Sequence, residues 1–122
     1  MYRERTNPNF IRYLKYQSND VFMRILKFCA CLVGNSSTGI KECSYFGIPV
    51  VNIGTRQSGR LRGQNVADVG YEKKSIKETI LAQYKHGAYS KSSVYYKKNT
   101  SKRIVEVLSQ ISLKSQKQFN DI

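Results

Sequence analysis

The segment CLVGNSSTGIKECSYFGIPVVNIG, Cys31 to Gly54, contains the alternation that decides the fold. Its apolar start, CLVG, predicts a short buried strand that ends at Gly34. The residues from Thr38 onward predict a helix that ends at Gly47. The β-branched run IPVVNIG, Ile48 to Gly54, is the clearest strand pattern in the chain. Strand, helix and strand in this order are typical of a parallel α/β sheet.

Further elements are expected on both sides of this segment. Residues 10–16, FIRYLKY, predict another strand, and a helix with a cap among residues 18–20 follows it. Two more helices are expected over about residues 75–84 and 100–111, and residues 113–122 are expected to be a frayed tail. The order of elements predicts an α/β fold, a Rossmann-like parallel sheet with flanking helices and right-handed crossovers.

The composition indicates a single globular domain with a basic surface. The chain has 122 residues, of which 40% are hydrophobic, and this length suits one domain at most. Its 21 Lys and Arg against 8 Asp and Glu give a net charge of +13, which raises the alternative of nucleic-acid binding. Because the basic residues are scattered and form no arginine-rich tract, a solvated basic surface is the preferred interpretation, and no nucleic-acid partner is expected.

The cysteines and the single histidine form no metal-binding pattern. Cys29, Cys31 and Cys43 contain no C-x-x-C pair, and His86 is far away in the sequence, so no zinc site is expected. Free, mostly buried thiols in a reducing compartment are the expected state. The first ten residues lack the apolar core of a signal peptide, and no apolar run is long enough to span a bilayer. A cytoplasmic protein without a membrane partner is therefore expected.

Two polar loops follow the two strands of the central segment. They are expected at the same edge of the sheet, where parallel α/β folds bind ligands. The first loop, GNSSTG, places the hydroxyls and main-chain N–H groups of Ser36, Ser37 and Thr38 at a helix start, which is typical of an anion site. It is not a P-loop, because Ile40 stands where that motif needs lysine. Simple helix capping by the serines is the alternative.

Charged residues make this interpretation more specific. The carboxylate of Glu42, one turn inside the helix, suits the two hydroxyls of a ribose, unless it is an ordinary exposed acid. Arg56 and Arg60 in the second loop, TRQSGR, offer guanidinium groups that match pairs of phosphate oxygens, with plain surface charge as the alternative. His86 is expected to be a structural residue at a helix end. The pattern predicts a nucleotide site without an obvious catalytic group.

The run VGNSSTGIKECSYFGIPVVNIGTRQSGRLRGQNVADV, Val33 to Val69, resembles the C-terminal domain of hydrolysing UDP-N-acetylglucosamine 2-epimerases. The shared pattern is N-S-S-x-G-I-x-E followed by F-G-x-P-V-x-N-x-G-x-R-Q-x-G-R, and SNDVFMRILKFCACL and NTSKRIVEVL match more loosely on either side. Non-hydrolysing relatives have S-G-G in place of the double serine. The resemblance implies two Rossmann-like domains of the glycosyltransferase-B type, with the nucleotide bound mainly by the C-terminal one.

The resemblance also implies roles for individual residues. Ser36 and Ser37 would bind the diphosphate, Glu42 the ribose hydroxyls, and Arg56 the phosphate side or the loop around it. The residues expected to support these loops are Gly39, Gln57, Gly59 and Arg60. Tyr95 to Asn99 depart from the family, which has a Gly-Asp-Gly-like turn before its last helix.

The implied reaction eliminates UDP across the sugar C1–C2 bond and then adds water, giving N-acetylmannosamine for sialic acid and related sugars. It needs no metal or redox cofactor. The family's acid–base carboxylates and catalytic histidine belong to the N-terminal domain and the interdomain region. No catalytic residue is therefore expected in this chain, and His86 does not match that histidine.

Residues 1–122 are accordingly expected to be a partial C-terminal UDP-binding domain that lacks the N-terminal domain. The expected partners are UDP or UDP-N-acetylglucosamine, together with a separate N-terminal half or a second copy of the chain. A non-catalytic nucleotide-binding or partner-pairing fragment is the alternative function.

Overall fold

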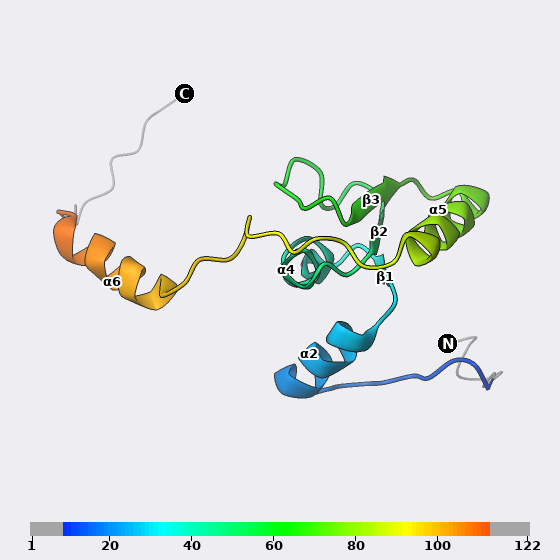
Figure 1. The fold of residues 1–122 in the computed structure, drawn as a ribbon, viewed down its shortest axis with the longest axis horizontal. Coiled ribbons are helices and arrows are strands. Elements are labelled where there is room, and N and C mark those ends of the chain that lie inside the picture. Colours follow the sequence, from blue (N-terminus) through cyan, green and yellow to red (C-terminus); the bar gives the residue numbers. More distant parts are fainter. Residues whose placement is uncertain (1–8, 113–122) are drawn as a thin grey trace, which may run out of the picture.

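The computed structural model describes residues 9–112 and contains a parallel sheet with helices around it (Figure 1). The strands pair in the order β1-β2-β3, and both pairs are parallel. This confirms the predicted α/β fold, a Rossmann-like parallel sheet with flanking helices. The elements are α2 (Asn19–Phe28), β1 (Leu32–Gly34), α3 (Ser37–Ile40), α4 (Glu42–Phe46), β2 (Val50–Ile53), β3 (Val66–Val69), α5 (Lys73–His86) and α6 (Thr100–Gln110).

β2 is the central strand of the sheet, and its residues are the most deeply buried. Its pairing with β1 places Gly34 opposite Asn52, and its pairing with β3 places Asn52 opposite Asp68. Val50, Val51 and Asn52 are all buried, as expected of a parallel strand that is paired on both sides. The three strands therefore end at one common edge of the sheet.

The hydrophobic core joins the first helices to β2. Leu26 of α2 and Cys43 of α4 pack with Ile48 and Val50, and partly buried Cys29 lies against them. Cys43 is fully buried, and this burial raises the pKa of its thiol to about 12. The cysteines are free thiols, as the sequence predicted.

Local sequence signals set most helix ends. The Ser18 hydroxyl caps α2 by accepting a hydrogen bond from the Val21 N–H at 3.4 Å. The helix expected from Thr38 onward is divided at Lys41 into α3 and α4, and α4 ends at Gly47 as predicted. Gly47 has a φ of +71°, and a Cβ there would lie 2.1 Å from the Tyr89 carbonyl oxygen. Only glycine fits at this position.

One strand prediction was wrong. Residues 10–16 form no strand, and the side chains of Phe10, Tyr13 and Tyr16 are exposed. A β-prone run becomes a strand only when a neighbouring strand supplies hydrogen bonds, and within residues 9–112 this run has none. The third strand is instead β3, Val66–Val69.

α6 lies apart from the sheet (Figure 1), and every one of its residues is exposed. More than half of the surface of each of its apolar residues Ile104, Val107 and Leu108 is exposed. None of the helices in residues 9–112 combines the length and the apolar character that crossing a membrane requires. The tail predicted for residues 113–122 lies outside the described residues.

Asn65, directly before β3, is a buried polar residue whose hydrogen bonds connect β2 with α4 and α5. Its Nδ2 donates to the Ile48 carbonyl oxygen at 2.8 Å, and its Oδ1 accepts from the Ser44 hydroxyl at 2.9 Å. Its carbonyl oxygen accepts from the Val50 N–H at 2.8 Å and from Gln83 Nε2 of α5 at 3.2 Å. Every polar group of this side chain is therefore paired.

We expect Asn65→Asp to lower the free energy of unfolding by about 3 kcal/mol at neutral pH, because a carboxylate cannot donate to Ile48 and is costly to bury. Urea denaturation followed by circular dichroism measures this. Gln64→Glu is the matched control, since it makes the same change at the exposed neighbouring position and should stay within about 0.5 kcal/mol of the wild type. Equal effects of the two changes would contradict the assignment.

Candidate functional site

The two loops that the sequence singled out meet at the carboxyl edge of the sheet. The serine loop, residues 34–36, begins at the last residue of β1, and the arginine loop, residues 54–60, follows β2. Gln57 Nε2 donates to the Asn35 carbonyl oxygen at 2.7 Å, and Arg56 Nη1 lies 3.5 Å from Asn35 Oδ1. The loops therefore contact each other directly, in the arrangement expected from parallel strands.

In the serine loop, Ser36 is the N-cap of α3. Its hydroxyl accepts from the Thr38 N–H at 3.3 Å, and its carbonyl accepts from the Gly39 N–H at 3.1 Å. The capping role that the sequence left open is thus present, and the exposed hydroxyl can still donate its proton. Ser37 begins α3 and is partly buried.

The two glycines predicted to support the loops have backbone and packing roles. A Cβ on Gly39 would lie 2.8 Å from Val50 Cγ1, so glycine lets α3 approach β2 closely. Gly59 has a φ of +75° with open space around it, so its turn requires glycine for conformation alone. Both glycines therefore help to set the backbone positions of the serine loop and the arginine loop.

The predicted arginines give this edge of the sheet its positive charge. Arg56 and Arg60 are both exposed. Within residues 9–112, neither forms an ion pair with a carboxylate. The Arg56 guanidinium lies 3.5 Å from Asn35, the residue before Ser36, and a guanidinium beside serine hydroxyls can bind an anion such as a diphosphate.

Gln57, also predicted as a supporting residue, is almost fully buried at 2% exposure. Its side-chain nitrogen makes the bond to Asn35, and its Oε1 has no hydrogen-bond partner within the described residues. Sequence reasoning missed Asn35, although a polar residue directly after the strand-ending Gly34 is a usable signal for a loop contact.

Glu42 lies in a surface hollow that neither the serine loop nor the arginine loop lines. It starts α4, is partly buried, and helps to form a surface pocket of about 300 Å³. The residues that line this pocket are Met23, Lys41, Glu42, Tyr45, Phe46 and Tyr95. The ring of Tyr45 also packs against Tyr96, with centroids 4.6 Å apart. The pocket thus combines the Glu42 carboxylate with aromatic surface.

His86 has the structural position expected of it. It is the last residue of α5, and its ring stacks on Tyr89 with centroids 3.8 Å apart. Its Nδ1 lies 3.1 Å from the Gly87 carbonyl oxygen. These contacts indicate that His86 has a packing role at the end of α5.

Comparison with known proteins finds a matching family and several similar proteins. The family model described as UDP-N-acetylglucosamine 2-epimerase matches residues 2–109. A UDP-N-acetylglucosamine 2-epimerase of Neisseria meningitidis serogroup B is 31% identical over 89% of this chain and 33% of its own length. The polysialic acid biosynthesis protein P7 of Escherichia coli is 32% identical over 90% of this chain and 29% of its own length.

A third relative carries the hydrolysing activity in its name. The UDP-N,N'-diacetylbacillosamine 2-epimerase (hydrolyzing) of Legionella pneumophila is 33% identical over 87% of this chain and 28% of its own length. The chain spans about a third of the length of the curated relatives it matches. The family match extends over nearly all of the chain, including both loops and all of α6 but its last residue. The chain therefore belongs to the UDP-N-acetylglucosamine 2-epimerase family.

Proposed function

We propose that this chain is the UDP-binding part of a hydrolysing UDP-N-acetylglucosamine 2-epimerase, which converts its substrate into UDP and N-acetylmannosamine for sialic acid-type biosynthesis. The observation that carries the proposal is the contact between the serine loop and the arginine loop. It brings the Arg56 guanidinium to the loop that carries the serine hydroxyls and the main-chain donors of a helix start. Family membership supplies the class of ligand.

In this proposal the ligand is shared between two neighbouring regions. Ser36, Ser37 and Arg56 bind the diphosphate, because they offer donors and positive charge. Glu42 accepts hydrogen bonds from the ribose hydroxyls, and the aromatic walls of its pocket provide a stacking surface for the base. The name of the Legionella pneumophila relative supports the hydrolysing branch.

The chemical step requires more than this chain. Elimination of UDP needs acid–base groups around the sugar C1–C2 bond, and the resemblance assigns them to another domain. Because the chain spans about a third of its relatives, we expect it to bind UDP without turning over the nucleotide sugar. Under this proposal, the chain by itself acts as a non-catalytic nucleotide-binding fragment.

Titration calorimetry of UDP into the purified chain tests the site. We expect measurable binding that Arg56→Ala weakens by about 10- to 100-fold, the range for loss of a charged hydrogen bond, and that Ser37→Ala weakens less. Arg103→Ala on α6 is the control, since it removes an exposed arginine away from the sheet (Figure 1). No heat from a chain that circular dichroism shows to be folded would contradict the proposal.

A second experiment tests whether different regions bind the diphosphate and the ribose. Glu42→Gln should weaken uridine and UDP by the same factor, because both carry the ribose. Arg56→Ala should weaken UDP and leave uridine unchanged, because uridine has no phosphate. Ligand-detected NMR can compare the weak uridine complexes, and equal losses for both ligands in both variants would contradict the assignment.

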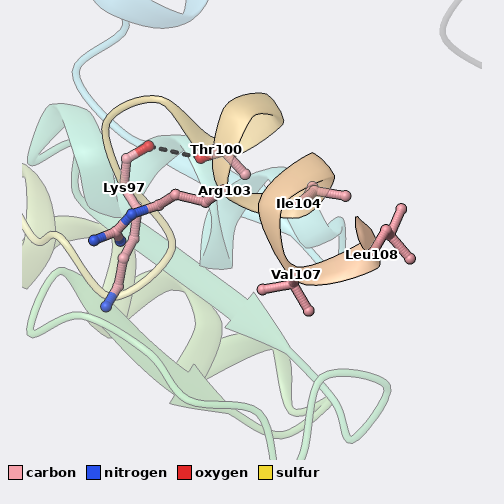
Figure 2. Close-up of a pocket in the computed structure, with 6 residues that line it drawn as sticks. All are labelled: Lys97, Thr100, Arg103, Ile104, Val107 and Leu108. Carbon is pink, nitrogen blue, oxygen red and sulfur yellow. Dashed lines mark hydrogen bonds between the residues drawn. The ribbon is translucent and has the colours of Figure 1, made fainter. Parts of the chain in front are cut away.

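We further propose that the apolar face of α6 packs against the rest of the epimerase polypeptide. Along one side of α6 lies an open hollow of about 310 Å³. The residues that line it are Lys97, Thr100, Arg103, Ile104, Val107 and Leu108 (Figure 2). Thr100 Oγ1 donates to the Lys97 carbonyl oxygen at 2.6 Å and fixes the start of the helix. An uncovered apolar face in a chain a third the length of its relatives favours a polypeptide partner.

Without that partner, we expect two copies of the chain to associate through this face. Sedimentation velocity should show a concentration-dependent increase in size that the double change Ile104→Glu, Leu108→Glu removes. Val105→Glu is the matched control, because Val105 is an exposed apolar residue of α6 outside the hollow. A wild-type chain that stays monomeric at all concentrations would contradict self-association through α6.

A further inference from the structure

An ion pair that the sequence did not predict lies beside the proposed anion site. Arg62 Nη1, in the segment between β2 and β3, pairs with the carboxylate oxygen Oδ2 of Asp68 on β3. The other oxygen of Asp68 accepts from Asn52 Nδ2 on β2 at 2.7 Å. Asn52 is 2% exposed, so this pair is connected directly to the buried centre of the sheet.

Arg62 also forms hydrogen bonds with the backbone of the arginine loop. Its Nη2 donates to the Gln57 carbonyl oxygen at 2.6 Å, and its Nε donates to the Arg60 carbonyl oxygen at 3.3 Å. All three guanidinium nitrogens therefore have protein partners, and the side chain is 22% exposed. Arg62 thus differs from Arg56 and Arg60, whose side chains are exposed.

The connection continues to the serine loop. Gln57, which accepts from Arg62 through its carbonyl, donates through its side chain to the Asn35 carbonyl oxygen at 2.7 Å. A continuous chain of hydrogen bonds thus passes from Asn52 through Asp68, Arg62 and Gln57 to Asn35, and touches all three strands or the loops that follow them. Its members Asn35 and Gln57 are the sequence neighbours of Ser36 and Arg56.

We propose that Arg62 and Asp68 are positioning residues: they fix the arginine loop against the serine loop so that Arg56 is aimed at the phosphates, while Arg62 itself does not bind the ligand. This inference rests on the proposed UDP-binding function. It assigns the three arginines of residues 56–62 two different roles, and the ion pair acts on the ligand only through the loop.

The proposal makes a prediction opposite in sign to simple electrostatics. If charge alone mattered, removing the Asp68 carboxylate would raise UDP affinity, because it deletes a negative charge near the phosphates and releases a cation. If Asp68 positions the loop through Arg62, the same change lowers UDP affinity although the chain becomes more positive. The direction of the effect therefore separates the two explanations.

The experiment compares Asp68→Asn and Arg62→Lys with the wild type by calorimetry with UDP. We expect both to weaken UDP about tenfold, because lysine keeps the charge but lacks the planar fork that reaches two carbonyls and a carboxylate. Uridine affinity should not change, since the loop acts on phosphate. Glu78→Gln, an equal change of charge at a 65% exposed side chain of α5, is the control and should leave UDP affinity within about twofold.

An Asp68→Asn chain that binds UDP as tightly as the wild type, or more tightly, overturns the proposal. Loss of uridine binding in step with UDP overturns it as well, because it indicates general disruption. Thermal unfolding confirms that each variant is folded, which is expected because the Asp68 side chain is 58% exposed.

Hydrogen exchange separates failure of this inference from failure of the proposed function. In the chain without ligand, amides of residues 55–60 should exchange faster in Asp68→Asn than in the wild type or Glu78→Gln. If the wild type does not bind UDP, the proposed function fails, and faster exchange in Asp68→Asn still supports the positioning role. Unchanged exchange overturns that role whether or not UDP binds.

Discussion

Parallel pairing of β2 with β1 and β3 is the constraint on which the rest of the structure depends. It aligns the carboxyl ends of the strands, and this alone brings two loops that are separated by a helical segment into contact. β2 is buried because it is paired on both sides, and its buried Asn52 can be tolerated only with a partner, which Asp68 provides. The polar edge of the sheet is thus a consequence of the same pairing that builds the core.

The sequence predicted those parts of the fold that local chemistry determines. The Ser18 cap, the end of α4 at Gly47 and the β-branched run of β2 are signals within a few residues, and the structure contains each of these features. The strand predicted for residues 10–16 failed because pairing is a non-local property. β3 escaped prediction for the same reason, since a four-residue strand is stabilised by its neighbour rather than by its own pattern.

The candidate site likewise contains residues that local sequence predicts and residues that depend on non-local pairing. Residues next to strand ends, such as Arg56, could be found from the sequence because the end of a parallel strand predicts where a loop lies. The pair Arg62 and Asp68 could not, because its geometry depends on the register that places Asp68 beside Asn52. Glu42 was identified as a candidate, but its aromatic pocket is formed by residues from α2, α4 and the segment before α6, which no local pattern connects.

Positioning and folding are carried by different residues in this small domain. Ile40, Cys43 and Val51 are completely buried and supply core stability, whereas the Arg62–Asp68 pair lies at the partly exposed edge. The Asp68 side chain is 58% exposed, and an asparagine there could still accept the hydrogen bond from Asn52, so this position can change without unfolding the sheet. In the proposed positioning role, a change at Arg62 or Asp68 therefore alters the arginine loop, while the strand pairing that aligns the two loops stays the same.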